Sequence, residues 1–324
     1  MEYMPNFQLH RPETPEEAIK LLNEQPEAKL VAGGTDMIVN VRRGIEQPKN
    51  LVDLSSINQL KEISKSNDGL RIGAGVTLKK VATAALIKNG YPAVAEAASS
   101  VAGGTHQQYG TLGGNLCLDT RCLFYNQSEW WRQSNDYCMK ERGDVCHVAP
   151  GGKRCFAAFS GDVAPAMLVY MAEVELLSST GIRRIPLAEM YQNDGMNHLT
   201  LAPDELVSAI HLPTNLNGSP SRYEKVRIRG SIDFPLAGAA VRLKMNSGKV
   251  EDISIALTGV NPFPQIIKGT DEYIGKALND EGLDILRDSV RKQAKPMKTT
   301  TVAPWYRRRV IGALARKLIK ELAA

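Results

Sequence analysis

The spacing of apolar residues predicts helices in both halves of the chain. Near the start, Thr14-Pro15-Glu16-Glu17 combines a capping box with a proline at the first helical position, and an apolar stripe follows it. The stripe that begins at Leu78 ends at Asn89-Gly90, which is typical of a helix C-terminus. The predicted helices span residues 14–22, 37–43, 78–90, 93–102, 280–294 and 304–322.

Shorter apolar runs, several of them alternating with polar residues, predict strands. The segment 213–220 is rich in asparagine, glycine, serine and proline, which is typical of a linker. The pattern therefore predicts an α+β protein with a boundary near this segment. The predicted strands span residues 29–32, 51–54, 69–77, 172–177, 183–186, 205–212, 223–229, 237–245 and 253–259.

Basic residues gather in the last predicted helix, which contains the run Tyr306-Arg307-Arg308-Arg309. We expect its apolar side to pack against a core and its basic side to be solvated, rather than to dock a partner. The apolar side consists of Val310, Ile311, Leu314, Leu318, Ile319 and Leu322.

Composition narrows the class of protein. With 324 residues, 43% of them hydrophobic, and a net charge of +5, the chain suits a folded soluble protein and does not indicate nucleic-acid binding. The segment Met1–Pro5 has neither the basic start nor the apolar core of a signal peptide, and no apolar run is long enough to span a bilayer. We therefore expect a cytoplasmic protein, in which clustered cysteines are metal ligands or reactive thiols.

Glycine-rich turns provide the first candidate chemistry. The strand at 29–32 runs into Gly33-Gly34-Thr35-Asp36, and a helix is predicted directly after it. A strand, a double glycine and a polar helix cap let backbone N–H groups approach a phosphate closely. The same residues also suit a plain turn with an N-cap, and both interpretations remain open at this point.

A second set of residues lies between the turn Gly110–Asn115 and the helix start at Gly161-Asp162. This stretch holds Cys122, Cys138, Cys146 and Cys155, together with seven of the chain's 19 aromatic residues. Four thiolates in one loop suit an iron–sulfur cluster or a structural zinc. Zinc sites usually contain close C-x2–4-C pairs, which these four cysteines lack, so the spacing favours iron–sulfur. A third interpretation is that the four are unrelated buried cysteines that bind no common metal.

Three further residues near these cysteines are possible ligands. Cys117 belongs to the glycine-rich turn, so it is left out of the ligand set. His106 and His147 could bind metal or donate protons, but an isolated histidine more often has a structural role.

Four motifs occur in order along the chain: Ala32-Gly33-Gly34-Thr35-Asp36, Ile72-Gly73-Ala74-Gly75-Val76-Thr77, Thr111-Leu112-Gly113-Gly114-Asn115 and Asp162-Val163-Ala164-Pro165-Ala166. Together they resemble the FAD-binding medium subunit of the xanthine dehydrogenase family of molybdenum hydroxylases, and the resemblance covers essentially the whole chain. It implies a two-part FAD-binding domain of the vanillyl-alcohol-oxidase (PCMH) type over residues 1–215, with subdomains 1–56 and 57–215. An α+β C-terminal domain over residues 216–324 would follow.

The resemblance also assigns residues to the cofactor. The loop Ala32, Gly33, Gly34, Thr35, Asp36 and Met37, together with Thr111, would hold the FAD pyrophosphate. Asn115 and Asp162 would bond the adenosine half, Val207 would line the pocket, and Lys225 would lie near the flavin. The other implied cofactor residues are Gly75, Thr77, Val101, Ala102 and Gly114. No catalytic residue is implied in this chain.

An insertion over residues 118–160 separates the third motif from the fourth, which follow each other closely in most family members. Its run from Cys122 to Trp131 resembles the β subunit of 4-hydroxybenzoyl-CoA reductase, as do the segments 225–229 and 233–238. In that enzyme the loop carries a [4Fe-4S] cluster. The resemblance therefore implies that Cys122, Cys138, Cys146 and Cys155 are cluster ligands.

The function implied is that of an electron-transfer subunit in the anaerobic degradation of aromatic compounds. Single electrons would pass from a ferredoxin-like donor through [4Fe-4S] and FAD to partner subunits that carry [2Fe-2S] clusters and the molybdenum cofactor. The partners would be a large molybdenum subunit and a small [2Fe-2S] subunit in a dimer of heterotrimers, with no nucleic acid and no membrane. The reaction would be the reductive dehydroxylation of 4-hydroxybenzoyl-CoA to benzoyl-CoA.

Two alternatives remain open. The chain could be the FAD subunit of another molybdenum hydroxylase, one that oxidises an aldehyde, a purine or an N-heterocycle. It could also be a non-catalytic flavin-binding module with a structural zinc.

Overall fold

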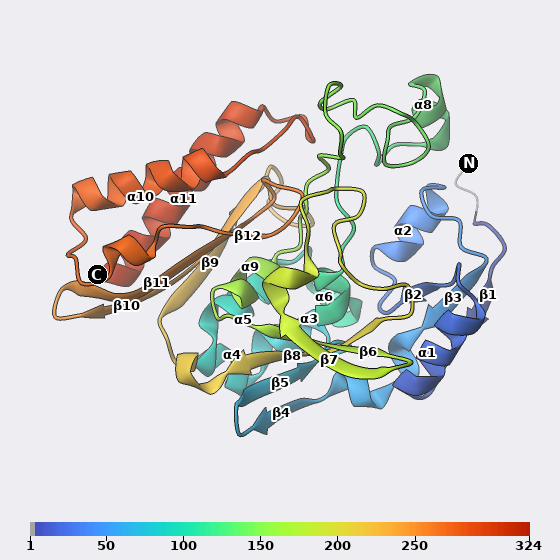
Figure 1. Ribbon diagram of the computed structural model, residues 1–324, viewed down its shortest axis with the longest axis horizontal. Coiled ribbons are helices and arrows are strands. Elements are labelled where there is room, and N and C mark those ends of the chain that lie inside the picture. The colour runs from blue at the N-terminus through green and yellow to red at the C-terminus, as the bar shows by residue number, and fades with distance from the viewer. Residues whose placement is uncertain (1–3) are drawn as a thin grey trace.

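The computed structural model describes residues 4–324 and contains three β-sheets with helices packed on and between them (Figure 1). The first three residues, part of the segment Met1–Pro5 in which no signal peptide is expected, lie outside the described residues.

The N-terminal unit is built around a parallel three-stranded sheet in the order β1-β3-β2. Thr14 caps α1 by accepting a hydrogen bond from the Glu17 N–H, as the capping box predicts. Ala18 on the buried side of α1 and Val52 of β3 belong to one apolar cluster. The elements are β1 (Gln8–His10), α1 (Pro15–Glu24), β2 (Lys29–Val31), α2 (Met37–Arg42) and β3 (Asn50–Asp53).

The second unit is an antiparallel five-stranded sheet in the order β4-β5-β8-β6-β7, with short helices packed against it. Its strands are β4 (Ile63–Ser66), β5 (Gly69–Gly73), β6 (Glu173–Ser178), β7 (Gly181–Pro186) and β8 (Leu206–Pro213). Its helices are α3 (Leu78–Thr83), α4 (Ala85–Gly90), α5 (Pro92–Ser100), α6 (Gly104–Tyr109), α7 (Leu112–Leu116) and α9 (Val163–Leu168).

Two sequence predictions in this unit are wrong in detail. The single helix expected over 78–90 is divided into α3 and α4, because Ala84 adopts an extended backbone with φ −64° and ψ 125°. The bend lets Val81 and Ile87, on the two helices, both reach the core. The strand expected over 69–77 ends at Gly73, because the next residues form a turn.

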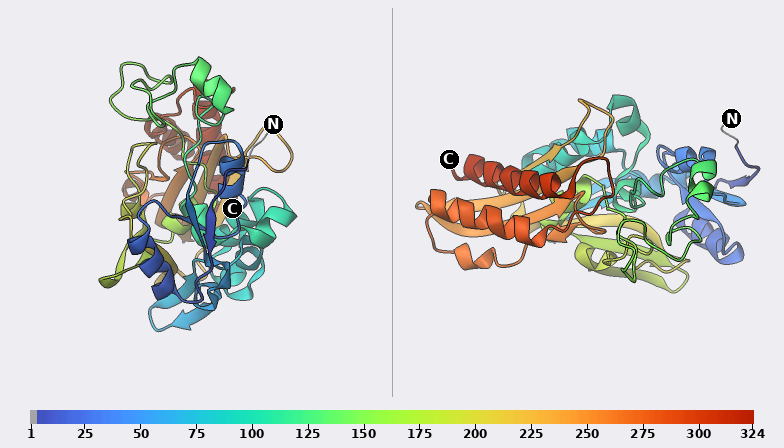
Figure 2. Two further views of the ribbon diagram at one scale, coloured as in Figure 1. Left: turned by 90° about the vertical axis from the view of Figure 1, so that its right-hand side faces the viewer. Right: turned by 90° about the horizontal axis from the view of Figure 1, so that it is seen from above.

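The C-terminal unit is an antiparallel four-stranded sheet in the order β12-β11-β10-β9, with two long helices on one face (Figures 1 and 2). The other face of this sheet contributes Ala240 and Ala256 to the core of the second unit, so the two units share buried surface. Its elements are β9 (Ser221–Val226), β10 (Ala237–Asn246), β11 (Lys249–Thr258), β12 (Gln265–Ile266), α10 (Asp280–Gln293) and α11 (Pro304–Ala323).

Helix α11 confirms one expectation and corrects another. Ile311, Leu314 and Leu318 are buried, as the apolar stripe predicts. Arg307 was expected on a solvated basic side but is 1% exposed, and burial lowers the pKa of its guanidinium to about 10. The guanidinium donates to backbone carbonyl groups that include Leu236 O and Met297 O, both at 2.9 Å. This arginine therefore anchors α11 instead of presenting a charge to solvent.

The four-cysteine segment forms a loop that stands out from the rest of the chain (green, above α2 in Figure 1). Paired hydrogen bonds between the backbones of Arg121 and Ala158 close its base. It contains α8 (Glu129–Ser134), which Ser128 caps. Arg132 on α8 donates to Gly44 O at 3.0 Å, and the Leu123 N–H donates to Thr299 O at 2.9 Å. The loop thus contacts both the N-terminal unit and the segment that precedes α11.

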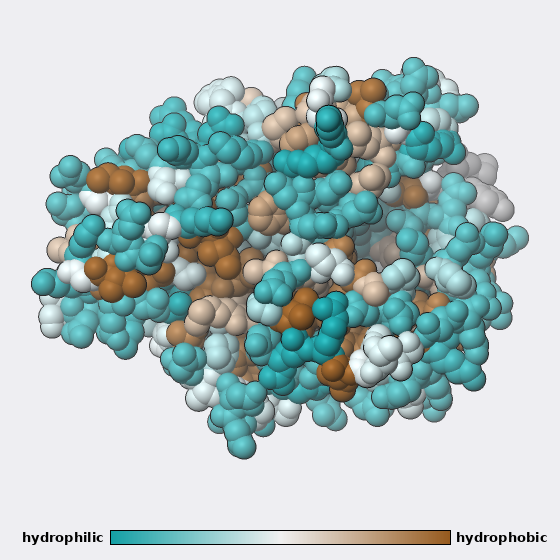
Figure 3. All heavy atoms as spheres, viewed as in Figure 1, coloured by the Kyte–Doolittle hydropathy of each residue, from teal (hydrophilic) through white to brown (hydrophobic). Residues whose placement is uncertain are grey.

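The surface shown in Figure 3 is largely hydrophilic, and its hydrophobic residues form small separate patches. Among residues 4–324, no helix combines the length and the apolar composition needed to cross a membrane.

Candidate functional site

The glycine-rich segments singled out in the sequence converge in space. The Leu78 N–H donates to Gly110 O at 2.8 Å, the Leu112 N–H to Val76 O at 2.9 Å, and the Gly113 N–H to Ala74 O at 2.8 Å. These three bonds hold the second and third motifs side by side, although more than thirty residues separate them in the sequence.

The first motif packs directly on the third. A Cβ atom at Gly33 would lie 1.8 Å from Tyr109 O, so only glycine permits this approach. Gly34 has a φ of +67°, which also favours glycine. A Cβ at Gly110 would lie 3.5 Å from the Thr35 hydroxyl oxygen. Three loops from different parts of the sequence therefore meet at one point.

The first loop presents backbone donors at this point. Among the described residues, no hydrogen-bond acceptor faces the backbone N–H of Gly33, Gly34, Thr35 or Asp36. Asp36 stands at the N-cap of α2, yet its side chain makes no capping bond. The plain-turn interpretation predicts such a bond. The free N–H groups fit the phosphate interpretation, because a pyrophosphate accepts several backbone hydrogen bonds at once.

Asn115 and Asp162 lie together beyond these loops. The Asn115 side-chain oxygen accepts from the Val163 N–H at 3.0 Å, which fixes the start of α9. Asp162 is buried and accepts from the Tyr223 hydroxyl at 2.7 Å and from Lys225 Nζ at 3.0 Å. Burial raises the pKa of Asp162, and the nearby ammonium of Lys225 opposes that rise. Asp162 and Lys225, which are predicted to contact different parts of FAD, thus bind each other.

The remaining predicted cofactor residues lie at the ends of neighbouring elements. Thr77 caps α3, and Thr111 caps α7 by accepting from the Gly114 N–H at 3.1 Å. The Gly75 N–H donates to Leu60 O at 2.7 Å, which fixes the turn after β5.

Val101, Ala102 and Val207 belong to segments other than the three loops. Val101 ends α5, and Ala102 has a φ of +45° and accepts from the Ile232 N–H at 3.1 Å. Val207 lies in β8 and is 5% exposed within the core of the five-stranded sheet. The backbone oxygen of its neighbour Ser208 accepts from the Ala74 N–H at 2.9 Å. Val207 is therefore adjacent to a residue that is bonded to the second motif.

The structure brings the four predicted cysteine ligands to one pocket. All four are buried, and none forms a disulfide. The cavity between them has a volume of about 10 Å³, which is roughly room for one water molecule. Its lining consists of Cys122, Phe124, Tyr125, Cys138, Met139, Lys140, Cys146, His147, Val148, Cys155 and Ala157.

Backbone N–H groups point at three of the four sulfurs. The Ala157 N–H donates to Cys155 Sγ at 3.4 Å, and Cys122 and Cys138 accept in the same way from the residues two positions later. These bonds favour the thiolate, whereas burial raises the pKa of Cys122 to about 12 and that of Cys155 to about 11. A metal that binds them must therefore displace their protons.

The pocket fits an iron–sulfur cluster by the chemistry of its donors, because four cysteine thiolates are the usual ligands of such clusters. A single zinc ion needs its sulfur ligands at about 2.3 Å, which brings them close to one another. Among the described residues, no three His, Cys, Asp or Glu side chains lie close enough to hold one metal ion.

The other three possible ligands, Cys117, His147 and His106, have different surroundings. Cys117 ends α7 and packs against the main core, outside the pocket, where burial raises its pKa to about 12. His147 lines the pocket, but its Nε2 lies 2.7 Å from Tyr137 O. His106 is half-buried on α6 and contacts the Thr105 hydroxyl.

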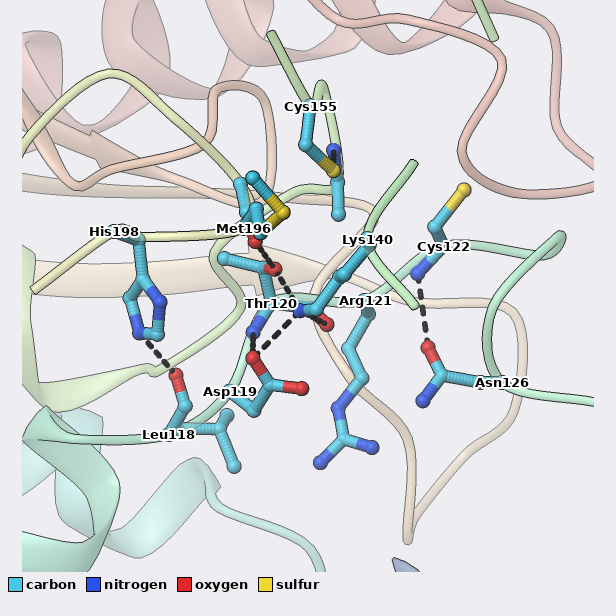
Figure 4. A network of polar contacts seen from close by, with 12 residues as sticks. Leu118, Asp119, Thr120, Arg121, Cys122, Asn126, Lys140, Cys155, Met196 and His198 are labelled. Carbon is cyan, nitrogen blue, oxygen red and sulfur yellow. Dashed lines mark hydrogen bonds and ion pairs between the residues drawn. The ribbon is translucent and has the colours of Figure 1, made fainter. Parts of the chain in front are cut away.

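Sequence reasoning missed residues that join the two sites. Arg121 and Cys122 are adjacent, and their side chains point to opposite sides of the chain (Figure 4). The Arg121 guanidinium pairs with Asp36 of the first loop and lies 4.8 Å from the centre of the Phe234 ring. Lys140 lines the cysteine pocket, and its ammonium donates to Asp119 and Thr120. No sequence signal separates these two cations from the chain's 38 other lysines and arginines.

Converging glycine-rich loops beside a five-stranded sheet, followed by an α+β unit, define the class of flavin-binding subunits. Residues 5–215 match the model of the FAD binding domain in molybdopterin dehydrogenase, and residues 221–322 match the CO dehydrogenase flavoprotein C-terminal domain. The chain belongs to the molybdenum hydroxylase family as an FAD-binding medium subunit, and it is thus an oxidoreductase subunit.

Relatives of this class match the chain over nearly its full length. The aldehyde oxidoreductase FAD-binding subunit PaoB of Escherichia coli K12 is 30% identical over 96% of this chain and 98% of its own length. The xanthine dehydrogenase FAD-binding subunit of Escherichia coli O157:H7 is 26% identical over 97% of this chain and 95% of its own. The structure of reconstituted CO dehydrogenase from Oligotropha carboxidovorans has a TM-score of 0.82 at 25% identity, with 99% of both chains covered.

Proposed function

We propose that this chain is the flavin and iron–sulfur subunit of a cytoplasmic molybdenum enzyme that removes the phenolic hydroxyl of 4-hydroxybenzoyl-CoA. The observation that carries the proposal is the pocket of four buried, unpaired cysteines inserted between two FAD motifs. The family explains the FAD motifs, and the insertion is the feature that requires a further explanation.

Two bound groups would supply the chemistry: a [4Fe-4S] cluster accepts single electrons, and FAD accepts them one at a time and releases them singly or in pairs. The overall reaction takes two electrons and two protons to convert 4-hydroxybenzoyl-CoA to benzoyl-CoA and water. A ferredoxin-like one-electron donor supplies the electrons. They would pass to large and small partner subunits, which carry the molybdenum cofactor and [2Fe-2S] clusters in a dimer of heterotrimers.

The residues of this chain would hold the two groups. The N–H groups of the loop from Gly33 to Asp36 would bind the FAD pyrophosphate, while Asn115 and Asp162 would face the adenosine half. Cys122, Cys138, Cys146 and Cys155 would bind the cluster. Arg121 joins the two sites, because its backbone closes the cysteine loop and its guanidinium pairs with Asp36.

The proposal is tested with the complex purified anaerobically together with its native partners. The complex is first reduced by a low-potential one-electron donor, and 4-hydroxybenzoyl-CoA is then added. We expect reoxidation of the flavin and the formation of benzoyl-CoA in a ratio of one product per two electrons. Oxidation of a purine or an aldehyde by the same complex, without turnover of the acyl-CoA, would contradict the proposal.

A second candidate is an FAD subunit of an oxidising molybdenum hydroxylase. The names of the relatives favour it, since they include a xanthine dehydrogenase and an aldehyde oxidoreductase. Electrons would then leave the complex through this chain. The same reduced complex, offered a range of one- and two-electron acceptors in place of the acyl-CoA, distinguishes the two directions.

A further inference from the structure

One lysine is placed where its charge acts on the cysteine pocket. Lys140 follows Cys138 by two residues and lies in a tight turn. In this turn the Glu141 and Gly143 N–H groups donate to Cys138 O at 2.9 and 3.1 Å. Its side chain is 5% exposed and lines the pocket together with the four cysteines. Of the described residues that form this lining, Lys140 is the only lysine or arginine.

The ammonium group is held firmly in place. It donates to Asp119 Oδ1 at 2.6 Å, to the Thr120 hydroxyl at 2.5 Å and to Thr120 O at 3.1 Å (Figure 4). Nζ also lies 4.7 Å from the centre of the Tyr125 ring. Asp119 is the one carboxylate in direct contact with it among the described residues, and Asp119 is 28% exposed, so water screens part of its negative charge.

The Lys140 side chain and the four cysteines line the same pocket, so the charge of the ammonium acts on the sulfurs and on a nearby acid. The carboxyl of Glu46 interacts with both Lys140 and Asp119. In a pocket lined by aromatic and aliphatic side chains, a charge acts over a longer distance than it would in water.

A buried positive charge has a defined effect on a metal centre that gains an electron. Reduction adds a negative charge to a centre that already carries four thiolates. A nearby cation stabilises the reduced state more than the oxidised state and thereby raises the reduction potential.

We propose that Lys140 is a positioning residue that raises the reduction potential of a cluster bound by Cys122, Cys138, Cys146 and Cys155. This inference rests on the proposed function, since it requires the cluster. The charge of Lys140 makes reduction of the cluster by the external donor more favourable. The negative charge of Asp119 offsets part of this effect.

The test is a redox titration of the anaerobically purified complex, with the reduced cluster followed by electron paramagnetic resonance. Lys140→Met removes the charge and keeps the length of the side chain. We expect its ratio of reduced to oxidised cluster at a fixed potential to fall about tenfold, a shift of about 59 mV for a one-electron couple. Lys140→Arg keeps the charge and should restore the wild-type potential.

Two further variants give the test its controls. Asp119→Asn removes the counter-charge and should shift the potential upward, opposite to Lys140→Met. Lys153→Met makes the same change at an exposed position of the same loop and should leave the potential unchanged.

The outcomes separate this inference from the proposed function. Full iron content with an unshifted potential in Lys140→Met would overturn it. If Lys140→Met loses iron, the reduction potential of Asp119→Asn becomes the deciding measurement. An unshifted or lowered potential in Asp119→Asn would overturn the inference. Absence of iron from the wild-type complex would instead refute the cluster itself, and with it the proposed function.

Discussion

Buried polar side chains near the two candidate sites each depend on a particular partner. His198 is 6% exposed, and its Nε2 lies 3.0 Å from Leu118 O, just ahead of the cysteine loop. Asp162 and Lys225 pair where the predicted FAD site meets the C-terminal sheet. At this scale the structure makes predictions that do not require either cofactor.

Stability should depend on pH through His198. Burial lowers the pKa of its imidazole from the usual 6.5 to about 4, so between these values the unfolded chain binds a proton that the folded chain does not. The free energy of unfolding should therefore decrease as the pH falls from 6.5 to 4, by up to about 1.4 kcal/mol per pH unit. Urea unfolding of wild type and His198→Gln across this range measures the effect. Equal slopes in the two proteins would refute this assignment.

The pair of Asp162 and Lys225 should show strong coupling. Each side chain is less than 5% exposed, so Asp162→Asn or Lys225→Met alone leaves a buried charge without its partner. We expect each single variant to lose about 3–5 kcal/mol of unfolding free energy and the double variant to recover much of that loss. Urea unfolding of the flavin-free chain provides the measurement. Additive losses in the double variant would show that the ion pair is not what stabilises this region.

At the scale of elements, the sequence predicted most helices and strands because their signals are local. The capping box placed α1, and the apolar stripes placed α10 and α11 within a few residues of their ends. The short strand β1 was missed, because Gln8–His10 is largely exposed and carries no apolar alternation. The burial of Arg307 was missed as well, because its carbonyl partners come from distant segments that only the tertiary fold brings together.

The first glycine-rich loop should tolerate no side chain at its point of contact. Gly33→Ala would place a Cβ 1.8 Å from Tyr109 O, so the loop must move away from the third motif. We expect this variant to lose most of its bound FAD, as measured by flavin absorbance per chain. Gly104→Ala is the matched control, because a Cβ there meets nothing within 4 Å. Full flavin content in Gly33→Ala would contradict the assignment of this loop to the cofactor.

At the scale of the whole molecule, the ordered motifs predicted the family, and the fold brings three of them together. The clustering of the four cysteines was also predictable from their density in one segment. The link between the two sites was not, because it depends on the opposed directions of Arg121 and Cys122 and on the reach of Lys140. Such features arise from the path of the chain in space and have no signature in the local sequence.

The central claim is that the cysteine pocket holds an iron–sulfur cluster beside FAD. Its most direct test is the iron, acid-labile sulfide and zinc content of the anaerobically purified wild type, compared with Cys122→Ser and with Cys117→Ser, which alters a partly buried cysteine outside the pocket. We predict about four iron and four sulfide per chain in wild type and in Cys117→Ser, and a marked loss of both in Cys122→Ser. Zinc without iron or sulfide in the wild type, or an equal metal content in all three proteins, would contradict the claim.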